Sequence, residues 1–371
     1  MKFLNIGCDK AIMDPHSDVR ARILEYGKIV EEFHVHTICK TKSQNKDEEK
    51  SQIEIAENVW IHSRSSWLKT FFTLGKVIRE KKIDVIVSPD PFIKAWVCMI
   101  FALIYRKKLL LSVYGGNIFD KHWKKLSIFN RIYSWLGRIV FSYAHAIQTD
   151  GLETLDVLVQ KYGKKVFWKP MVPANIDYLL AINRINPEQS EISLQNDSRK
   201  KPTVLFVGRL IKQKNIPFLA RVIKEIQNDA NVVVVGDGPE KHLLDDLDIV
   251  YYSRQNREEI VERFKEADIF MLTSYFEGFA RVIMEAALAG VPVVTTKVSG
   301  TSGIVTHDVS GFVFEQGNEK DFIEAVKMLM QNQNKRMVMG RAIREAARSN
   351  LSTAMMLEKQ KQIHHYFETL K

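Results

Sequence analysis

The segment DIFMLTSYFEGFARVIMEAALAGVPVVTT, residues 268–296, contains the pattern that decides the fold. An apolar run, a turn with a glycine, an apolar helical segment and a second apolar run follow one another. This order is typical of a strand, a helix and a parallel strand. Two acids interrupt the apolar residues: Glu277 in the turn and Glu285 about a turn and a half into the helix. A buried helix needs neither acid, so the segment indicates a polar ligand at this corner of a sheet.

The same alternation of apolar runs and helical patterns extends over most of the 371 residues. One series occupies residues 1–185 and a second occupies 200–351, and the polar segment 181–201 reads as a linker or an exposed loop between them. We therefore expect an α/β protein with two doubly wound, Rossmann-like domains facing across a cleft. Ligands in such sheets bind at the carboxyl ends of the strands, so the cleft is the expected site.

The composition limits the classes of function. The chain has 46% apolar and 26% charged residues and a net charge of +10, which is normal for a globular protein with an anionic partner. Charge alone does not distinguish a phosphorylated ligand, an anionic membrane surface and nucleic acid, but no nucleic-acid-binding motif occurs, so nucleic acid is not expected. Three cysteines without metal-ligand spacing favour a cytoplasmic protein. The longest uncharged run, 95–105, is too short to span a bilayer.

A second stretch, VGRLIKQKN at 207–215, supplies cations at a strand end. Gly208 ends the apolar run, and Arg209 and Lys214 follow in the loop. A planar guanidinium fork and a point charge suit a diphosphate, whereas two solvated loop cations are the alternative. A third stretch, VVVVGDGPE at 232–240, contains glycines that permit close approach of a ligand, although an ordinary strand-to-helix turn explains them better.

The turn and helix start in the first stretch predict an anion site. The helix is expected to begin near residues 279–281, and free backbone N–H groups at 278–281 would then face a diphosphate. The carboxylate of Glu285 suits a ribose diol, because it can accept two hydroxyl hydrogen bonds. The alternatives are a helix-dipole partner for Glu277 and a solvated position for Glu285, whose neighbours are, however, apolar.

These three stretches, together with SGFVFE at 310–315, resemble the retaining glycosyltransferases of family 4, which have the GT-B fold. The resemblance is continuous in order and spacing from about Val204 to Glu315. It includes the Glu-x7-Glu signature of that family at Glu277 and Glu285.

The resemblance implies transfer of a sugar from a UDP- or GDP-sugar to an acceptor hydroxyl, with retention of anomeric configuration, in polysaccharide, lipopolysaccharide or glycolipid assembly. It implies an acceptor-binding domain at 1–185 and a donor-binding domain at 200–351. By the same resemblance, a C-terminal helix at about 352–371 packs back on the first domain. The expected partners are a nucleotide-diphosphate sugar and a glycan or lipid-linked acceptor.

The resemblance also assigns tasks within the donor site. Arg209 and Lys214 would hold the diphosphate and act in catalysis together with Glu277, which would touch the donor sugar, while Glu285 would bind the ribose. The segment 253–257 would lie near the base. No metal or other cofactor is expected, because cations and a helix start can stabilise the charge of the leaving diphosphate. The predicted donor-binding residues are Gly208, Arg209, Lys214, Arg254, Glu277, Gly278, Phe279, Ala280 and Glu285.

The first domain resembles the family more loosely. Where many relatives have His-Gly, this chain has a tyrosine and two glycines, so a histidine often proposed to assist the acceptor is absent. The acceptor-side candidates are therefore Tyr114, Gly115, Gly116, Asn117, Asp120 and His122. Two alternatives stay open: a non-catalytic nucleotide-sugar-binding subunit of a membrane glycan-synthesis complex, and a nucleotide-sugar epimerase of the same fold.

Residues 121–145, KHWKKLSIFNRIYSWLGRIVFSYAH, combine five Lys or Arg with several aromatic residues and no acid. This composition is typical of a helix in the interface of an anionic membrane, and a lipid-linked acceptor would suit it. The protein would then be cytoplasmic and peripheral on the inner face of the cell membrane. An equally consistent interpretation is a core helix with a solvated basic face, in which Ile128, Ile132, Leu136 and Ile139 pack inward.

Overall fold

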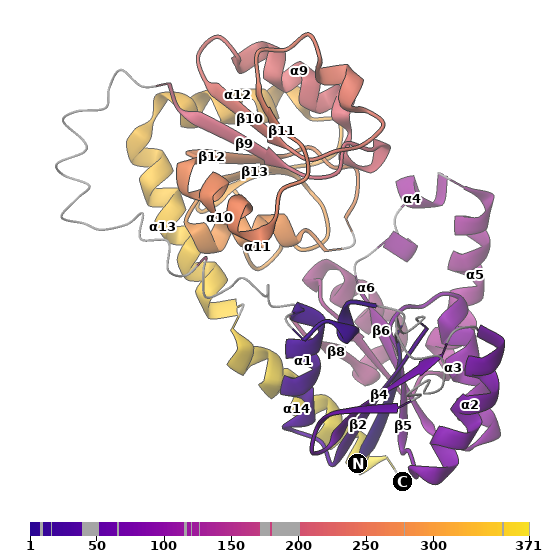
Figure 1. Ribbon diagram of the computed structural model, residues 1–371. Helices are drawn as coiled ribbons and strands as arrows, with labels where there is room; N and C mark the ends of the chain where they lie inside the picture. The colour runs from indigo at the N-terminus through magenta and orange to yellow at the C-terminus, as the bar shows by residue number, and fades with distance from the viewer. Residues whose placement is uncertain are drawn as a thin grey trace, which may run out of the picture.

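Two sheets, each covered by helices, form the body of the protein in the computed structural model (Figure 1). Helix α13 belongs to the half that contains β9 to β14, and the chain continues from it as α14 along the half that contains both termini. The described residues are 1–7, 10–15, 17–38, 52–64, 67–114, 117–119, 121–125, 127–170, 179, 201–277, 279–350 and 352–370. The polar segment 181–201 lies outside these ranges except for its last residue.

The first sheet has the strand order β3-β4-β2-β1-β5-β6-β7-β8. Neighbouring strands are parallel except β3 and β4, which pair in antiparallel fashion at one edge. Its elements are β1 (Lys2–Ile6), η1 (Lys10–Met13), α1 (Asp18–Gly27), β2 (Glu32–Ile38), β3 (Gln52–Ala56), β4 (Val59–Arg64), α2 (Trp67–Glu80), β5 (Val85–Ser88), α3 (Ile93–Ile104), β6 (Lys108–Val113), η2 (Asn117–Phe119), α4 (Lys121–Lys125), α5 (Ile128–Tyr143), β7 (Ala146–Thr149), α6 (Leu152–Tyr162), η3 (Gly163–Lys165) and β8 (Val166–Trp168).

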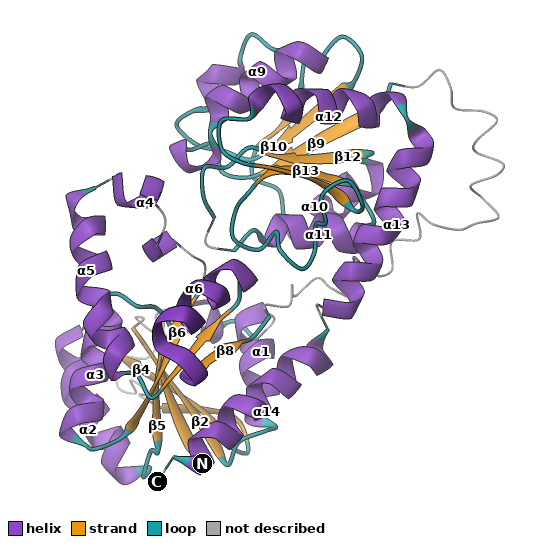
Figure 2. Ribbon diagram, turned by 180° about the vertical axis from the view of Figure 1, so that it is seen from behind, coloured by secondary structure: helices purple, strands orange, loops and turns teal. Residues whose placement is uncertain are grey.

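The second sheet is parallel throughout, in the order β11-β10-β9-β12-β13-β14. Figure 2 shows its central strands β10, β9, β12 and β13 side by side. Such sheets are buried on both faces, which explains the unbroken apolar runs of strands such as β12. Its elements are β9 (Thr203–Val207), η4 (Lys212–Lys214), α9 (Ile216–Ile226), β10 (Asn231–Val235), η5 (Lys241–Leu244), β11 (Val250–Tyr252), α10 (Arg257–Glu266), β12 (Ile269–Leu272), α11 (Arg281–Ala289), β13 (Val293–Thr296), β14 (Gly311–Phe314), α12 (Glu319–Gln331) and α13 (Gln333–Asn350).

The last helix, α14 (Thr353–Thr369), packs against the first sheet rather than the second. Its Ile363 and Phe367 are fully buried in one cluster with Phe3 of β1 and Val85 of β5. Lys108 at the start of β6 donates from Nζ to the carbonyl oxygens of Phe367 and Leu370, at 2.7 Å each. The end of the chain is therefore fixed to the first sheet by apolar packing and by hydrogen bonds.

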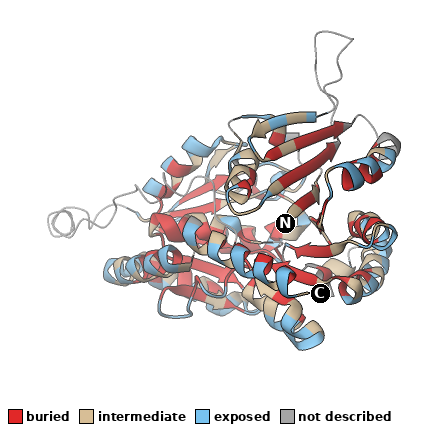
Figure 3. Ribbon diagram, turned by 90° about the horizontal axis from the view of Figure 1, so that it is seen from below, coloured by how far each residue is buried: buried red, intermediate tan, exposed pale blue. Residues whose placement is uncertain are grey.

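The predicted α/β architecture with two sheets is confirmed, and the sheets are parallel except at the β3–β4 edge. Figure 3 shows the buried strands inside and the helices with exposed outer faces. The hairpin of β3 and β4 was not predicted, although residues 52–56 alternate polar and apolar side chains as an edge strand does.

Helix α5 does not bury the face that it would bury as a core helix with a solvated basic face. Its buried residues are Gly137, Val140 and Phe141. Ile128, Ile132 and Ile139 are exposed and only Leu136 is half-buried, so the alternative in which these four residues pack inward is wrong. The physical reason is that α5 is apolar on two faces, and the face with the small Gly137 is the one that packs against the domain. Among the described residues, no helix combines the length and the apolar character needed to cross a bilayer.

Candidate functional site

A cleft of about 570 Å³ lies at the carboxyl edge of the six-stranded sheet, and we call it the donor cleft. The loops that follow β9 and β12 and the first turns of α10 and α11 enclose it. Ligands of open α/β sheets bind at this edge because loops and helix starts converge there. Its lining residues are Val207, Gly208, Lys214, Arg254, Gln255, Asn256, Arg257, Ile260, Glu277, Phe279, Ala280, Arg281, Val282 and Glu285.

An ion pair occupies the floor of the donor cleft. Nζ of Lys214 lies 2.6 Å from Oε1 of Glu277, and both residues are buried. Oε1 also accepts a hydrogen bond from the hydroxyl of Ser274, and Oε2 accepts one from Nε2 of Gln213 at 3.1 Å. A carboxylate offers about four acceptor positions, so this fixed group can still accept a hydroxyl from a ligand.

Gln213 and Ser274 hold the Glu277 carboxylate in place, and the sequence did not single out either residue. Gln213 also donates to the carbonyl oxygen of Phe276 at 3.1 Å, so it fixes both the backbone and the carboxylate of the loop after β12. The carbonyl oxygen of Ser274 in turn accepts a hydrogen bond from Thr296 at 2.6 Å. Gln213 immediately precedes Lys214, and Ser274 lies in the segment 268–296. Neither was predicted, because a neutral polar residue in a loop carries no periodic signal.

The glycines around the donor cleft have different explanations. A Cβ atom on Gly208 would lie 3.2 Å from Cε of Lys214, so this glycine leaves room for the lysine to reach Glu277. A Cβ atom on Gly236 would lie 1.8 Å from the carbonyl oxygen of Gly208, and one on Gly238 would lie 2.2 Å from that of Leu210. The GDG turn is thus explained by close packing of two loops, which agrees with the ordinary-turn interpretation.

The segment after β11 forms part of the wall of the donor cleft. Arg254 lines the cleft, and Asn256 begins α10 with a capping box in which its side chain accepts from the N–H of Glu259. The capping box fixes the direction in which the chain enters the helix. Glu285, on the first turns of α11, is half-buried at the cleft and interacts with another described residue.

Part of the predicted anion site is wrong. The N–H of Ala280 donates to the carbonyl oxygen of Ser299 at 3.1 Å, and the N–H of Arg281 donates to that of Phe279 at 2.8 Å. Neither group is free for a phosphate, because the loop after β13 and a tight turn satisfy them before α11 begins. Arg209 is exposed and does not line the cleft, and Gly278 lies outside the described residues.

The acceptor-side candidates are less completely defined. Tyr114 is exposed at the end of β6 and lines a separate cavity of the first domain. Asn117 begins η2 and His122 lies in α4. Gly115, Gly116 and Asp120 lie outside the described residues.

A direct contact joins the two domains beside the donor cleft. Glu153, in the first turn of α6, accepts hydrogen bonds at Oε1 from the N–H of Ser302 at 2.8 Å and from the hydroxyl of Thr301 at 3.1 Å. Its Oε2 lies 3.4 Å from the N–H of Gly300. A Cβ atom on Gly300 would lie 3.0 Å from the backbone nitrogen of Ala280, so this contact adjoins the start of α11.

Comparison with known proteins identifies relatives over this part of the chain. Residues 188–346 match the family model of the glycosyl transferases group 1. Over 169 residues the chain is 28% identical to the sulfoquinovosyl transferase SQD2 of Arabidopsis thaliana, a match that covers 44% of this chain and 33% of the plant protein.

A longer match, 26% identical over 281 residues, covers 73% of this chain and 74% of a Campylobacter jejuni protein. That protein is the N,N'-diacetylbacillosaminyl-diphospho-undecaprenol alpha-1,3-N-acetylgalactosaminyltransferase. Among solved structures, HepE of Anabaena in complex with UDP superposes with a TM-score of 0.70 at 16% identity, covering 100% of this chain and 99% of HepE. At this identity the likeness shows the fold, which is GT-B.

Proposed function

We propose that this chain, which matches the model of the group 1 glycosyltransferases over residues 188–346, moves a sugar from a nucleotide-diphosphate sugar to an acceptor hydroxyl with retention of configuration. UDP and GDP are the candidate nucleotides. The observation that carries the proposal is the donor cleft, in which Lys214, Glu277 and Glu285 converge at the carboxyl edge of the second sheet. A cleft with these groups suits a ligand that has both anionic and hydroxyl parts.

The chemistry requires charge stabilisation. The leaving diphosphate gains negative charge as the sugar becomes oxocarbenium-like, and fixed cations near that charge lower the barrier. Lys214 is fixed by its ion pair, and Arg209, one residue beyond Gly208, would turn towards the diphosphate when the donor binds. The departing phosphate oxygen would take the acceptor proton. In this proposal the cations supply the stabilisation and no metal is required.

The two acids would bind hydroxyl groups. Glu277 would accept a hydrogen bond from the donor sugar with its remaining acceptor position, and its fixed orientation would align the sugar with the diphosphate. Glu285 would accept hydrogen bonds from the ribose. Arg254 would lie against the base, since a guanidinium plane stacks well on an aromatic ring.

The acceptor would be a glycan or a lipid-linked sugar at an anionic membrane, reached from the cytoplasm. Helix α5 supports this, because its exposed side chains include an apolar row at helical spacing, with Arg131 and Arg138 exposed beside it. Such a face can enter the headgroup region while cations contact anionic lipid. The row consists of Ile128, Ile132, Trp135 and Ile139, with Phe129 adjacent.

Nucleotide binding is the first test. The full chain is heated with UDP, GDP and their sugars, and the correct nucleotide at 100 times its Kd should add about 2.7 kcal/mol of stability. Lys214→Ala should abolish this shift, whereas Lys212→Ala, an exposed lysine of the same loop, should retain it. Absence of any shift at millimolar nucleotide would contradict the proposal.

Transfer is the second test, and it separates an enzyme from a non-catalytic binding subunit. The purified chain should hydrolyse the correct nucleotide-sugar slowly in the absence of acceptor, and the anomeric proton of the first product should show retention by NMR. EDTA should leave the rate unchanged. Binding without turnover would favour the subunit, and an isomerised donor would favour the epimerase.

A further inference from the structure

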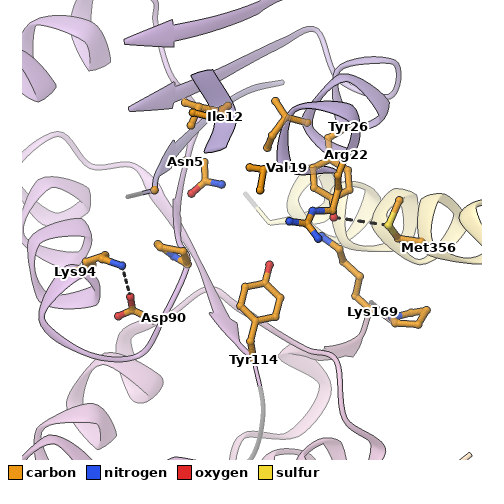
Figure 4. A pocket seen from close by; sticks show the side chains of 15 residues that line it. Asn5, Ile12, Val19, Arg22, Tyr26, Asp90, Lys94, Tyr114, Lys169 and Met356 are labelled. Atoms are coloured by element: carbon orange, nitrogen blue, oxygen red, sulfur yellow. Dashed lines mark hydrogen bonds and ion pairs between the residues drawn. The ribbon is translucent and has the colours of Figure 1, made fainter. Parts of the chain in front are cut away.

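A cavity of about 340 Å³ lies in the first domain at the carboxyl ends of β1, β5, β6 and β8, and we call it the α1 cavity. Residues from α1 form one wall, and Met356 of α14 contributes to it (Figure 4). Pro170 lines both this cavity and a smaller one that also contacts Phe279 of the donor cleft. The α1 cavity therefore adjoins the site proposed for the donor.

A buried lysine points into the α1 cavity. Lys169 is only 6% exposed, and its Nζ lies 4.1 Å from the centre of the Tyr26 ring. Within the part of the chain that the structure describes, no carboxylate forms an ion pair with it. Burial lowers the pKa of Lys169 to about 8, while the charge of Asp150 acts in the opposite direction. A buried ammonium without an ion pair is costly. An anionic ligand in the α1 cavity would supply the missing partner.

A second cation lies beside it. Arg22 of α1 lines the cavity, and its charge contributes to the lowered pKa of Lys169. Figure 4 shows Arg22, Lys169 and the hydroxyl of Tyr114 directed at the same space. On the opposite side, Lys94 pairs with Asp90 at 2.8 Å, so those two charges compensate each other. Two neighbouring like charges therefore face the cavity, and an oxyanion between them would relieve both the desolvation and the repulsion.

Neutral polar groups complete the lining. Oδ1 of Asn5 is buried and has no hydrogen-bond partner among the described residues. Because an amide also carries two donors, Asn5 and the hydroxyl of Tyr114 can contribute hydrogen bonds to a polar ligand. A planar guanidinium fork with a lysine point charge is the combination that suits a phosphate.

We propose that the α1 cavity binds a phosphate group of the acceptor, held by Arg22 and Lys169. Identifying the bound molecule as the acceptor rests on the proposed function. Binding of the phosphate itself does not depend on transferase activity. The acceptor would then be a sugar phosphate or a prenyl-diphosphate sugar, which share this chemistry. The phosphate would anchor the acceptor while its hydroxyl faces the donor cleft past Pro170.

Calorimetric titration of the full chain with inorganic pyrophosphate, in the presence of saturating UDP, tests the proposal. Lys169→Met and Arg22→Gln should each weaken pyrophosphate binding at least tenfold, and Lys164→Met, an exposed lysine near β8, should not. Lys169→Met removes a buried charge, so the variant is expected to remain folded. Unchanged pyrophosphate binding in both variants, or none in the unmodified chain at millimolar concentration, would overturn the proposal.

Further arms separate this result from the donor site and identify the source of the phosphate. Lys214→Ala, titrated without UDP, should lose nucleotide binding but retain pyrophosphate binding. Lys169→Met should retain nucleotide binding but lose pyrophosphate binding when UDP fills the donor cleft. Failure of nucleotide binding alone would therefore count against the proposed function only. Displacement of pyrophosphate by glucose 1-phosphate would assign a soluble acceptor, and displacement by geranyl diphosphate a prenyl-linked one. Displacement by neither would overturn the assignment to an acceptor phosphate.

Discussion

Nζ of Lys214 lies 2.6 Å from Oε1 of Glu277, and this pair joins the loop after β9 to the loop after β12. Both side chains are nearly buried, so each charge depends on the other for its stability. The same two residues are the ones proposed to act on the diphosphate and on the sugar. Stability and activity should therefore respond together when either residue is changed.

A double-mutant cycle in urea measures this dependence. Lys214→Met and Glu277→Gln should each destabilise the chain by about 3 kcal/mol, because each leaves a buried charge unpaired. The double variant should cost at least about 1 kcal/mol less than the sum of the two. Additivity within about 0.5 kcal/mol would show that the pair is not coupled. In the transfer assay, Glu277→Gln should lower kcat more than it weakens nucleotide binding.

Closure of the two domains should depend on Glu153. Glu153→Ala removes the hydrogen bonds to the backbone of Ser302 and to Thr301. Hydrogen bonds to a charged group contribute about 1.5 kcal/mol or more, so the closed arrangement should become roughly tenfold less favoured. Small-angle scattering should show a larger radius of gyration and the transfer rate should fall, whereas Asp156→Ala, an exposed acid of α6, should change neither. An unchanged radius would contradict this role for Glu153.

The fold was largely predictable because the second sheet is buried on both faces. Strands such as β12 are short apolar runs that end in turns, and that combination of length and boundaries is typical of a strand buried on both faces. The hairpin of β3 and β4 was missed because an edge pair leaves only a short alternation in the sequence. For α5, periodicity identified apolar faces, but only packing around Gly137 decides which face is inward.

The sequence predicted those parts of the donor site that depend on charged residue types. It did not predict which backbone groups are already hydrogen-bonded to loops distant in the sequence. Glu277 stands out as a charge in an apolar stretch and Lys214 as a cation shortly after a strand-ending glycine, and the cleft contains both. The engagement of the Ala280 N–H by Ser299 depends on a loop that follows β13, which the sequence of α11 does not reveal. Lys169 was not among the predicted site residues, because burial of a lone lysine has no sequence signature.

Binding to anionic membranes should depend on the exposed row of α5. Trp135→Ser should lower the partition coefficient onto phosphatidylglycerol vesicles, measured by sedimentation, at least tenfold, since burial of a large apolar side chain is worth about 1.5–3 kcal/mol. Vesicle binding of the unmodified chain should also weaken strongly as the salt concentration rises. Met328→Ser, at an exposed apolar position of α12, is the control and should bind as the unmodified chain does. The proposal that α5 binds a membrane would be contradicted if the unmodified chain did not bind vesicles, or if Trp135→Ser and Met328→Ser bound them equally.

Acid should destabilise the chain through His364 of α14. Burial lowers the pKa of His364 to about 4, against 6.5 for the unperturbed group, and the imidazole lies 2.9 Å from Nε2 of Gln360. The unfolded chain therefore takes up a proton as the pH falls below 6.5, while the folded chain does not until near 4. The stabilisation is complete above pH 6.5 and is lost as the pH falls, by about 2 kcal/mol between pH 7 and pH 5.

Urea unfolding at those two pH values measures the loss. His364→Gln should show a shallower decline in the free energy of unfolding, because the titrating group is gone. His365→Gln changes the neighbouring histidine, which is exposed, and should decline as the unmodified chain does. An identical decline in His364→Gln and in the unmodified chain would show that α14 is not held to the first domain by a neutral imidazole.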